Sequence, residues 1–423
     1  MNLELKNVGK INNACIELNG ITLVAGENNT GKSTIGKMLF CVLHSFYKID
    51  EQVREERTTA VHRLLYNFVQ EKSPAVAVIG RKSLHTIAKK LIVQKEAYLS
   101  DKTLLINDLK ESHKAFKQFQ KDVSDQLADK ICIYLKLKDD VIRETILKKR
   151  LEAEFAMRIG HLNNLTEKTT VRLMIKGDYI DFQIEQNERV YINHYLNLAK
   201  GIIYIDDPFV LDDLKQSLYF AFQKPYNHRS DLIDKIANEK AASSFTLVDE
   251  LVAKKKLEKI LSAMNEVCDG NLSSDGGHFI YRTDKLSGSL DMVNLSTGMK
   301  SFIILRQLLQ NGNIDENGVI ILDEPEIHLH PEWQLKFAEC IVLIQKEFGV
   351  NILLTTHSPY FLNAIEVYSD KYGIEKKCNY YLLDEKDGQA SVINATDHTE
   401  IIYEKLAKPL QELENLEYRN DTL

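Results

Sequence analysis

The sequence of 423 residues predicts an α/β fold, in which a mixed β-sheet flanked by helices is interrupted by a helical insertion. Two apolar runs, Ile21–Ala25 and Val319–Leu322, each lead into polar residues, as buried strands do at the sheet edge where ligands bind. Residues 50–160 hold a single proline, Pro74, and repeat apolar residues at helical spacing. We therefore expect both ends of the chain to build the sheet, with the helices inserted between them.

These patterns divide the chain into five expected segments. Strands and helices alternate after Phe279, which suggests βαβ units on a parallel sheet, and a polar patch at Asp269–Gly277 precedes them. A strand at Tyr380–Leu383 and a helix at Ile401–Leu416 are expected to complete the fold. The segments are an N-terminal part with a glycine-rich loop (1–48), the helical insertion (49–165), strands completing the N-terminal lobe (166–209), a second helical segment (210–278) and the C-terminal part (279–423).

Composition indicates a globular cytoplasmic protein without a membrane partner. Hydrophobic residues make up 44% and charged residues 27%, and no apolar run is long enough to cross a bilayer. The N-terminus lacks the basic and then apolar pattern of a signal peptide. Six scattered cysteines without a Cys-x-x-Cys pair argue against a zinc ribbon or a disulfide framework. The net charge of −7 gives no general attraction to nucleic acid.

The expected insertion carries a local excess of positive charge. Between Asp50 and Gly160 there are 22 Lys/Arg and 17 Asp/Glu, and between Arg81 and Lys121 there are ten and four. Its heptad pattern is poor, which predicts a compact helical subdomain rather than a long coiled coil. We expect it to contact a protein partner or a second subunit, although a solvated helical face and DNA contact also account for the charge.

The first chemical motif is Gly26-Glu-Asn-Asn-Thr-Gly31-Lys32-Ser33-Thr34, which fits G-x-x-x-x-G-K-[ST] between a strand and a helix. Glycines let such a loop fold with its N–H groups pointing at a phosphate, and the following helix adds its positive end. Lys32 would bridge the β- and γ-phosphates and the Ser33 hydroxyl would bind magnesium. The expected nucleotide-binding residues here are Gly26, Asn28, Asn29, Gly31, Lys32, Ser33 and Thr34.

Two further strands are expected to end beside this loop. Asp323-Glu324-Pro325 follows Val319–Leu322, so Asp323 is predicted to hold magnesium and Glu324 to act as general base for an attacking water. His357 follows the apolar run Ile352-Leu-Leu and lies 33 residues after Glu324, room for one helix and a neighbouring strand. It is predicted to reach the γ-phosphate. A histidine satisfied in the core is the alternative.

Weaker signals lie between these motifs. Asn294-Leu-Ser296-Thr-Gly298-Met-Lys-Ser301 precedes an apolar helix, so Ser296 and Gly298 either bind an anion at its N-terminus or simply cap it. His328 and His330 are two residues apart, a spacing that would face them in opposite directions on a strand. We therefore do not expect them to bind a metal.

Taken together, the phosphate loop, long helical insertion, Leu-Ser-x-Gly signature, Asp-Glu-Pro strand and final histidine resemble the ABC-type ATPase head. They are most similar to the branch with SMC, RecF and OLD (overcoming lysogenisation defect) ATPases. The phrase Asp323–Pro331 followed by Thr356–Pro359 is closest to the OLD-like group, which is common in bacterial anti-phage systems. The resemblance is strong over residues 1–48 and 285–365 and loose over 170–207.

This resemblance implies a P-loop NTPase of the ABC-head type that uses ATP and Mg²⁺. Ser296 and Gly298 would touch the γ-phosphate of ATP held by a second subunit, giving a homodimer or higher homo-oligomer. Thr297 and Met299 depart from the transporter signature Leu-Ser-Gly-Gly-Gln, which implies slow or partner-dependent hydrolysis. OLD proteins usually add a Toprim nuclease domain, but only about 60 residues follow His357, so any nuclease would come from another chain.

The leading functional interpretation is an ATPase that associates with ATP and controls a separate effector, a nuclease or toxin, in anti-phage defence. A RecF-like ATPase that binds DNA in repair or maintenance is the alternative. A transporter subunit ranks third, because the insertion and the Met-containing signature count against it.

Overall fold

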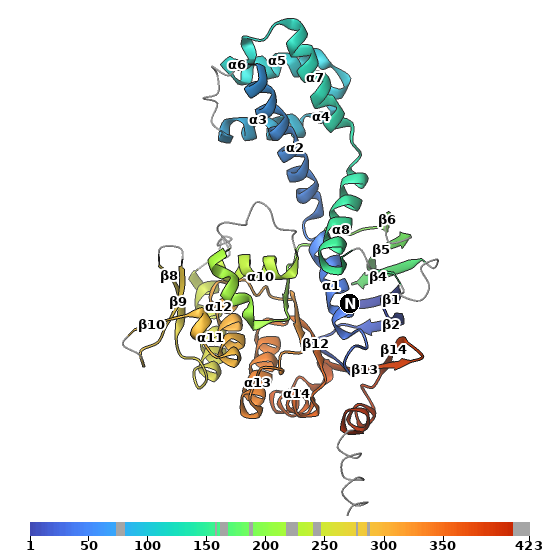
Figure 1. Ribbon diagram of the computed structural model, residues 1–423, viewed down its shortest axis with the longest axis vertical. Helices are drawn as coiled ribbons and strands as arrows, with labels where there is room; N and C mark the ends of the chain where they lie inside the picture. The colour runs from blue at the N-terminus through green and yellow to red at the C-terminus, as the bar shows by residue number, and fades with distance from the viewer. Residues whose placement is uncertain are drawn as a thin grey trace, which may run out of the picture. The chain divides into compact units, whose positions relative to one another are not determined.

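A computed structural model describes residues 1–72, 81–156, 159–160, 168–185, 189–216, 227–239, 247–275, 278–285 and 288–408 (Figure 1). Its internal contacts divide the chain into two compact units, residues 1–47 with 147–423 and residues 48–146. The predicted α/β class with a helical insertion is confirmed. The finer division into five segments remains a proposal. No described helix is both long enough and apolar enough to cross a membrane.

The first unit is built on a mixed sheet of eleven described strands. The five strands β13, β3, β12, β11 and β7 pair in parallel at one end of this sheet, and the remaining pairs are antiparallel except for β14 with β2. The strand order is β6 (Arg189–His194), β5 (Asp178–Glu185), β4 (Thr169–Ile175), β1 (Asn2–Val8), β2 (Ile11–Glu17), β14 (Gln389–Asn394), β13 (Cys378–Lys386), β3 (Ile21–Gly26), β12 (Asn351–Thr356), β11 (Val319–Asp323) and β7 (Ile202–Ile205).

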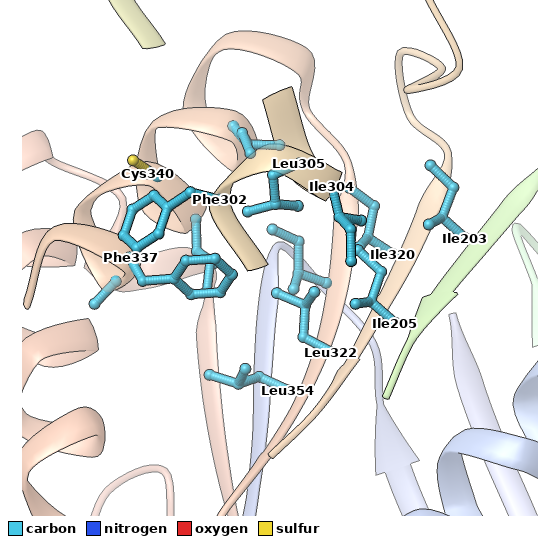
Figure 2. Close-up of a cluster of buried hydrophobic side chains, with 14 of the residues drawn as sticks. Ile203, Ile205, Phe302, Ile304, Leu305, Ile320, Leu322, Phe337, Cys340 and Leu354 are labelled. Carbon is cyan, nitrogen blue, oxygen red and sulfur yellow. The ribbon is translucent and has the colours of Figure 1, made fainter. Parts of the chain in front are cut away.

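The parallel strands are covered on both faces, which explains why their sequences read as continuous apolar runs. Every residue of β3, β7 and β11 is buried. Alternate side chains point to opposite faces. Ile205, Ile320 and Leu322 belong to a core shared with the helices in Figure 2, whereas Ile321 and Tyr204 face Gly36 of helix α1 (Lys32–Phe46).

The core on the helical side is filled largely by aromatic and branched side chains. Phe302 and Phe337 meet edge to face with their ring centroids 5.1 Å apart, over the strands that carry Leu322 and Leu354 (Figure 2). The surrounding elements are η2 (Pro208–Gln216), α10 (His228–Ala237), α11 (Leu247–Met264), η3 (Met292–Asn294), α12 (Thr297–Gln310), α13 (Pro331–Phe348), α14 (Pro359–Tyr372) and η4 (Glu375–Lys377).

One part of this unit differs from the predicted βαβ alternation. Strands β8 (Asn271–Asp275), β9 (His278–Arg282) and β10 (Ser289–Asp291) form a separate antiparallel sheet. The connections are too short for a parallel crossover, which needs about a dozen residues, so hairpins form instead. Strand β13 contains the predicted strand Tyr380–Leu383. Residues 400–408 are helical, and the rest of the predicted helix Ile401–Leu416 lies outside the described residues.

The second unit is helical and has a core of its own. Its larger side chains, such as Phe68, Tyr98 and Phe116, are buried among leucines from several helices. The amphipathic patterns of α3 and α7 supply some of these leucines, among them Leu84 and Leu127. The helices are α2 (Ile49–Lys72), α3 (Arg81–Val93), α4 (Lys95–Ser100), α5 (Lys102–Ser112), α6 (Lys114–Lys117), α7 (Lys121–Lys136) and the first part of α8 (Asp139–Phe155).

Candidate nucleotide site

The glycine-rich loop joins β3 to α1. Gly31 occupies the N-cap of α1 with φ 104°, a left-handed conformation that suits glycine. Gly31 brings no capping side chain, so the first N–H groups of α1 are left for an anion, as at phosphate-binding helix ends. Asn28 and Asn29 lie exposed in the loop, and Ser33 and Thr34 lie half-buried in the first turn of α1.

Lys32 is buried although it carries a charge, with 3% of its surface exposed. Its Nζ donates to the carbonyl oxygens of Gly26, at 2.9 Å, and Glu27, at 2.8 Å. The same Nζ lies 3.1 Å from Oε1 of Glu324. The ammonium group is thus folded back over the loop and neutralised by a carboxylate from another strand end.

Asp323 ends β11 and is buried. Tyr204 donates its hydroxyl to Oδ2 at 3.0 Å, and Thr355, its register partner on β12, donates to Oδ1. Both partners are neutral hydroxyls, so they orient the carboxylate without cancelling its charge.

Glu324 and His357 meet at the adjacent strand ends. Glu324 has φ 49°, and its N–H donates to the backbone oxygen of Thr355 at 3.2 Å and to the Thr355 hydroxyl at 3.0 Å. Its Oε2 lies 3.6 Å from Nδ1 of His357, while Oε1 faces Lys32. The structure therefore brings Lys32, Asp323, Glu324 and His357 together, and we call these four the strand-end cluster.

These residues fit a magnesium nucleotide. Oxygen donors are what Mg²⁺ prefers, and the buried Asp323 carboxylate and the Ser33 hydroxyl offer them from packed elements, since α1 contacts β11. The buried Lys32 and the uncapped N-terminus of α1 suit the phosphates. ATP would be held by the loop, and magnesium by Ser33 and Asp323.

Ser296 and Gly298 lie apart from this cluster. Ser296 is exposed and caps α12, accepting from the N–H of Met299 at 3.4 Å, so the capping alternative describes a real contact. A Cβ at Gly298 would lie 2.9 Å from the Trp333 ring, so only glycine permits this approach. An open pocket of about 410 Å³, the signature pocket, is lined by Ser296, Thr297, Gly298, His328, His330 and Trp333.

A model of the family described as the AAA ATPase domain matches residues 1–362, which include the phosphate loop, the signature, Asp323 and His357. The chain belongs to this family. Two curated relatives are similar to part of this chain. The Retron Ec83 probable ATPase of Escherichia coli is 30% identical over 33% of this chain and 26% of its own length. The Septu protein PtuA of Bacillus thuringiensis is 28% identical over 40% of this chain and 44% of its own.

The matches thus span less than half of each of these relatives. Among solved structures, the SMC head domain from Thermotoga maritima has a TM-score of 0.40 and 11% identity, covering 93% of this chain and 97% of that one. An ATP-binding cassette of an ABC transporter in its ADP conformation has a TM-score of 0.35 and 13% identity, covering 97% of this chain and 96% of that one.

Several residues around the site of this AAA ATPase domain carried no recognisable sequence signal. Glu326, two residues after the predicted base, is 2% exposed and accepts from the Thr356 hydroxyl and from the N–H of His357, at 3.2 Å. Burial raises the pKa of Glu326. Tyr204 and Thr355 read as ordinary strand residues, yet both hold Asp323.

The interpretation of the histidine pair in this AAA ATPase domain needs one correction. His328 and His330 lie in a turn rather than on a strand, and both line the signature pocket. The chain turns after Glu324, whose positive φ ends the extended conformation, so the expected two-residue alternation does not apply. No group of three metal-binding side chains gathers there among the described residues.

Proposed function

We propose that this chain binds ATP with Mg²⁺ and hydrolyses it at sites completed by a second copy of itself. The observation that carries the proposal is the meeting of Lys32, Glu324 and His357 beside the phosphate loop. Bound magnesium would neutralise negative charge on the phosphates.

Lys32 has the first task, to hold the phosphates. Without nucleotide its ammonium is shared between two loop carbonyls and Glu324. A phosphate oxygen competes for that ammonium and releases the Glu324 carboxylate. Glu324 can then accept a proton from water, and His357, whose Nδ1 lies 3.6 Å from it, is placed to donate to the γ-phosphate.

The signature pocket supports the second part of the proposal. Ser296 is exposed at the N-terminus of α12, so an anion from another molecule can reach its hydroxyl and the helix N–H groups. The pocket is open, and its lining contains none of the strand-end cluster among the residues that the structure describes. A γ-phosphate held by a partner would complete it.

The wider role that we propose is control of a separate effector, a nuclease or toxin, in anti-phage defence, with slow or partner-dependent turnover. The similarity to a retron ATPase and to a Septu protein supports this placement. The test is the mass of Glu324→Gln in solution with and without Mg·ATP. We expect the mass of this variant to increase when Mg·ATP is added. A mass that does not change would contradict the composite site.

A RecF-like DNA-binding ATPase is the second candidate, favoured by the lysines of the second unit. Lys89, Lys90, Lys114 and Lys117 are all exposed. If the unit contacts protein, reversing these four charges should weaken partner assembly and leave duplex affinity unchanged. If duplex affinity instead collapses while partner assembly is untouched, and if duplex affinity of the parent chain falls steeply with salt, DNA binding takes first place.

A further inference from the structure

Strand β7 supplies a residue that the proposed chemistry does not use. Tyr204 is fully buried, and its hydroxyl donates to Oδ2 of Asp323 at 3.0 Å. Thr355 on β12 donates to Oδ1 of the same carboxylate. Because β11 lies between β7 and β12, each neighbouring strand contributes one hydroxyl to one carboxylate oxygen. Asp323 is thus held from both sides.

The sheet register explains why Tyr204 reaches this carboxylate. Tyr204 pairs with Ile321, and Asp323 lies two residues further along the same strand, so both side chains point to the same face. A diagonal neighbour at this spacing lies within reach of an aromatic side chain.

A buried ionic triad lies behind Tyr204. The His228 ring stacks on the tyrosine with centroids 4.5 Å apart and planes 26° apart. Its Nδ1 lies 2.6 Å from Glu154 and its Nε2 lies 2.8 Å from Asp206. Since a carboxylate faces each nitrogen, both nitrogens carry a proton and the ring is a cation. Burial lowers the pKa of His228, but the hydrogen bonds to Asp206 and Glu154 outweigh it and raise the pKa to about 9.

We propose that Tyr204 is a positioning residue for the magnesium carboxylate Asp323, and that His228, clamped by Glu154 and Asp206, holds Tyr204 in place. This inference rests on the proposed role of Asp323. A carboxylate with one donor on each oxygen loses its torsional freedom, so its remaining lone pairs keep one direction toward the metal.

The chemistry of the triad argues against simple core filling. A phenylalanine would pack in the place of Tyr204, and apolar residues could replace a buried ionic group without loss of stability. A cationic ring stacked on Tyr204 instead stabilises that ring position and favours its hydroxyl as a donor to the Asp323 carboxylate. Phe40, with its centroid 6.0 Å from Tyr204 and 6.1 Å from His228, borders the stack.

The experiment compares Tyr204→Phe with Asp323→Asn and a matched control, Tyr281→Phe. Tyr281 is also buried, and its hydroxyl accepts from the N–H of Gly270 at 2.7 Å, in the separate small sheet. The readouts are Mn²⁺ binding by electron paramagnetic resonance in the presence of a fluorescent non-hydrolysable ATP analogue, the affinity of that analogue without metal, and the thermal unfolding midpoint.

For Tyr204→Phe we expect Mn²⁺ affinity about tenfold weaker, with metal-free nucleotide affinity unchanged. Tyr281→Phe should lower the thermal unfolding midpoint but leave Mn²⁺ affinity unchanged. If Tyr204→Phe keeps the Mn²⁺ affinity of the parent while Asp323→Asn loses it, the proposed role of Tyr204 is overturned and the proposed metal site stands. Should Asp323→Asn itself keep its Mn²⁺ affinity, the proposed metal site fails, and the inference with it.

His228→Gln keeps the test decisive if Tyr204→Phe does not fold. It leaves the tyrosine hydroxyl present but removes the stacked cation. We expect Mn²⁺ binding about threefold weaker, in line with the loss of one cation–π contact. A folded His228→Gln protein with unchanged Mn²⁺ affinity would show that the triad does not position Tyr204.

Discussion

The strand-end cluster and the signature pocket satisfy their polar groups in opposite ways. In the cluster, Lys32 is paired with Glu324 and Asp323 accepts from two hydroxyls. In the pocket, Ser296 is exposed and its hydroxyl accepts only from its own helix among the contacts described here. The cluster is pre-assembled within one chain, whereas the pocket has room for a group from another molecule. One chain should thus bind nucleotide, and two should be needed to complete the site.

The largest expected effect on nucleotide binding comes from removing the ammonium from the cluster. Lys32→Ala should weaken nucleotide binding about 100-fold, because charged hydrogen bonds to the phosphates are lost and Glu324 keeps an unpaired charge near them. Equilibrium binding of a fluorescent ATP analogue measures this. Lys10→Ala, which breaks the outer pair with Glu385 at 3.0 Å, should bind normally. Retained affinity in Lys32→Ala would contradict the assignment of the loop.

Glu324→Gln separates binding from chemistry within the same cluster. The amide cannot take a proton from water, so turnover should fall about 100- to 10,000-fold. Nucleotide affinity should be kept or improved, since Lys32 no longer has an anionic partner to leave. Steady-state phosphate release and equilibrium binding are the two measurements. Parent-rate turnover would mean that Glu324 is not the base.

Ser296→Arg tests the other side of the comparison. A large cation should block the approach of a second subunit, so ATP-dependent association of the Glu324→Gln protein should be lost while one chain still binds ATP. Ser296→Ala is the control, because it removes the cap at a cost of about 1 kcal/mol without adding bulk. Light scattering gives the masses. Equal masses with and without Ser296→Arg would argue that the pocket takes no partner.

The strand-end cluster and the ionic triad behind Tyr204 differ in how far the sequence predicts them. Asp323 and His357 follow apolar runs, and parallel strands bring such ends to one edge, so their meeting with Lys32 could be predicted. His228 and Glu154 could not, because they are 74 residues apart and each resembles an ordinary helix residue. The small sheet of β8 to β10 was missed because its strands are short and lie beside a polar patch.

The last expected effect concerns the support beneath the cluster, and it is a dependence of stability on pH. His228 is held by Glu154 and Asp206, is stacked on Tyr204, and has a pKa raised from 6.5 to about 9. A raised pKa means that the folded protein binds the proton more tightly than the unfolded chain does. Its stabilising contribution is therefore complete below pH 6.5 and is lost as pH rises through 9.

The shift corresponds to at most about 3 kcal/mol, and the glutamine of His228→Gln cannot titrate. We therefore expect the difference in unfolding free energy between the parent and His228→Gln to be largest near pH 6 and to shrink by that amount toward pH 10. Urea unfolding at several pH values measures it, and groups common to both proteins cancel. A difference that stays constant across this range would show that His228 is not held as a cation, and the support proposed for Tyr204 would lose its electrostatic basis.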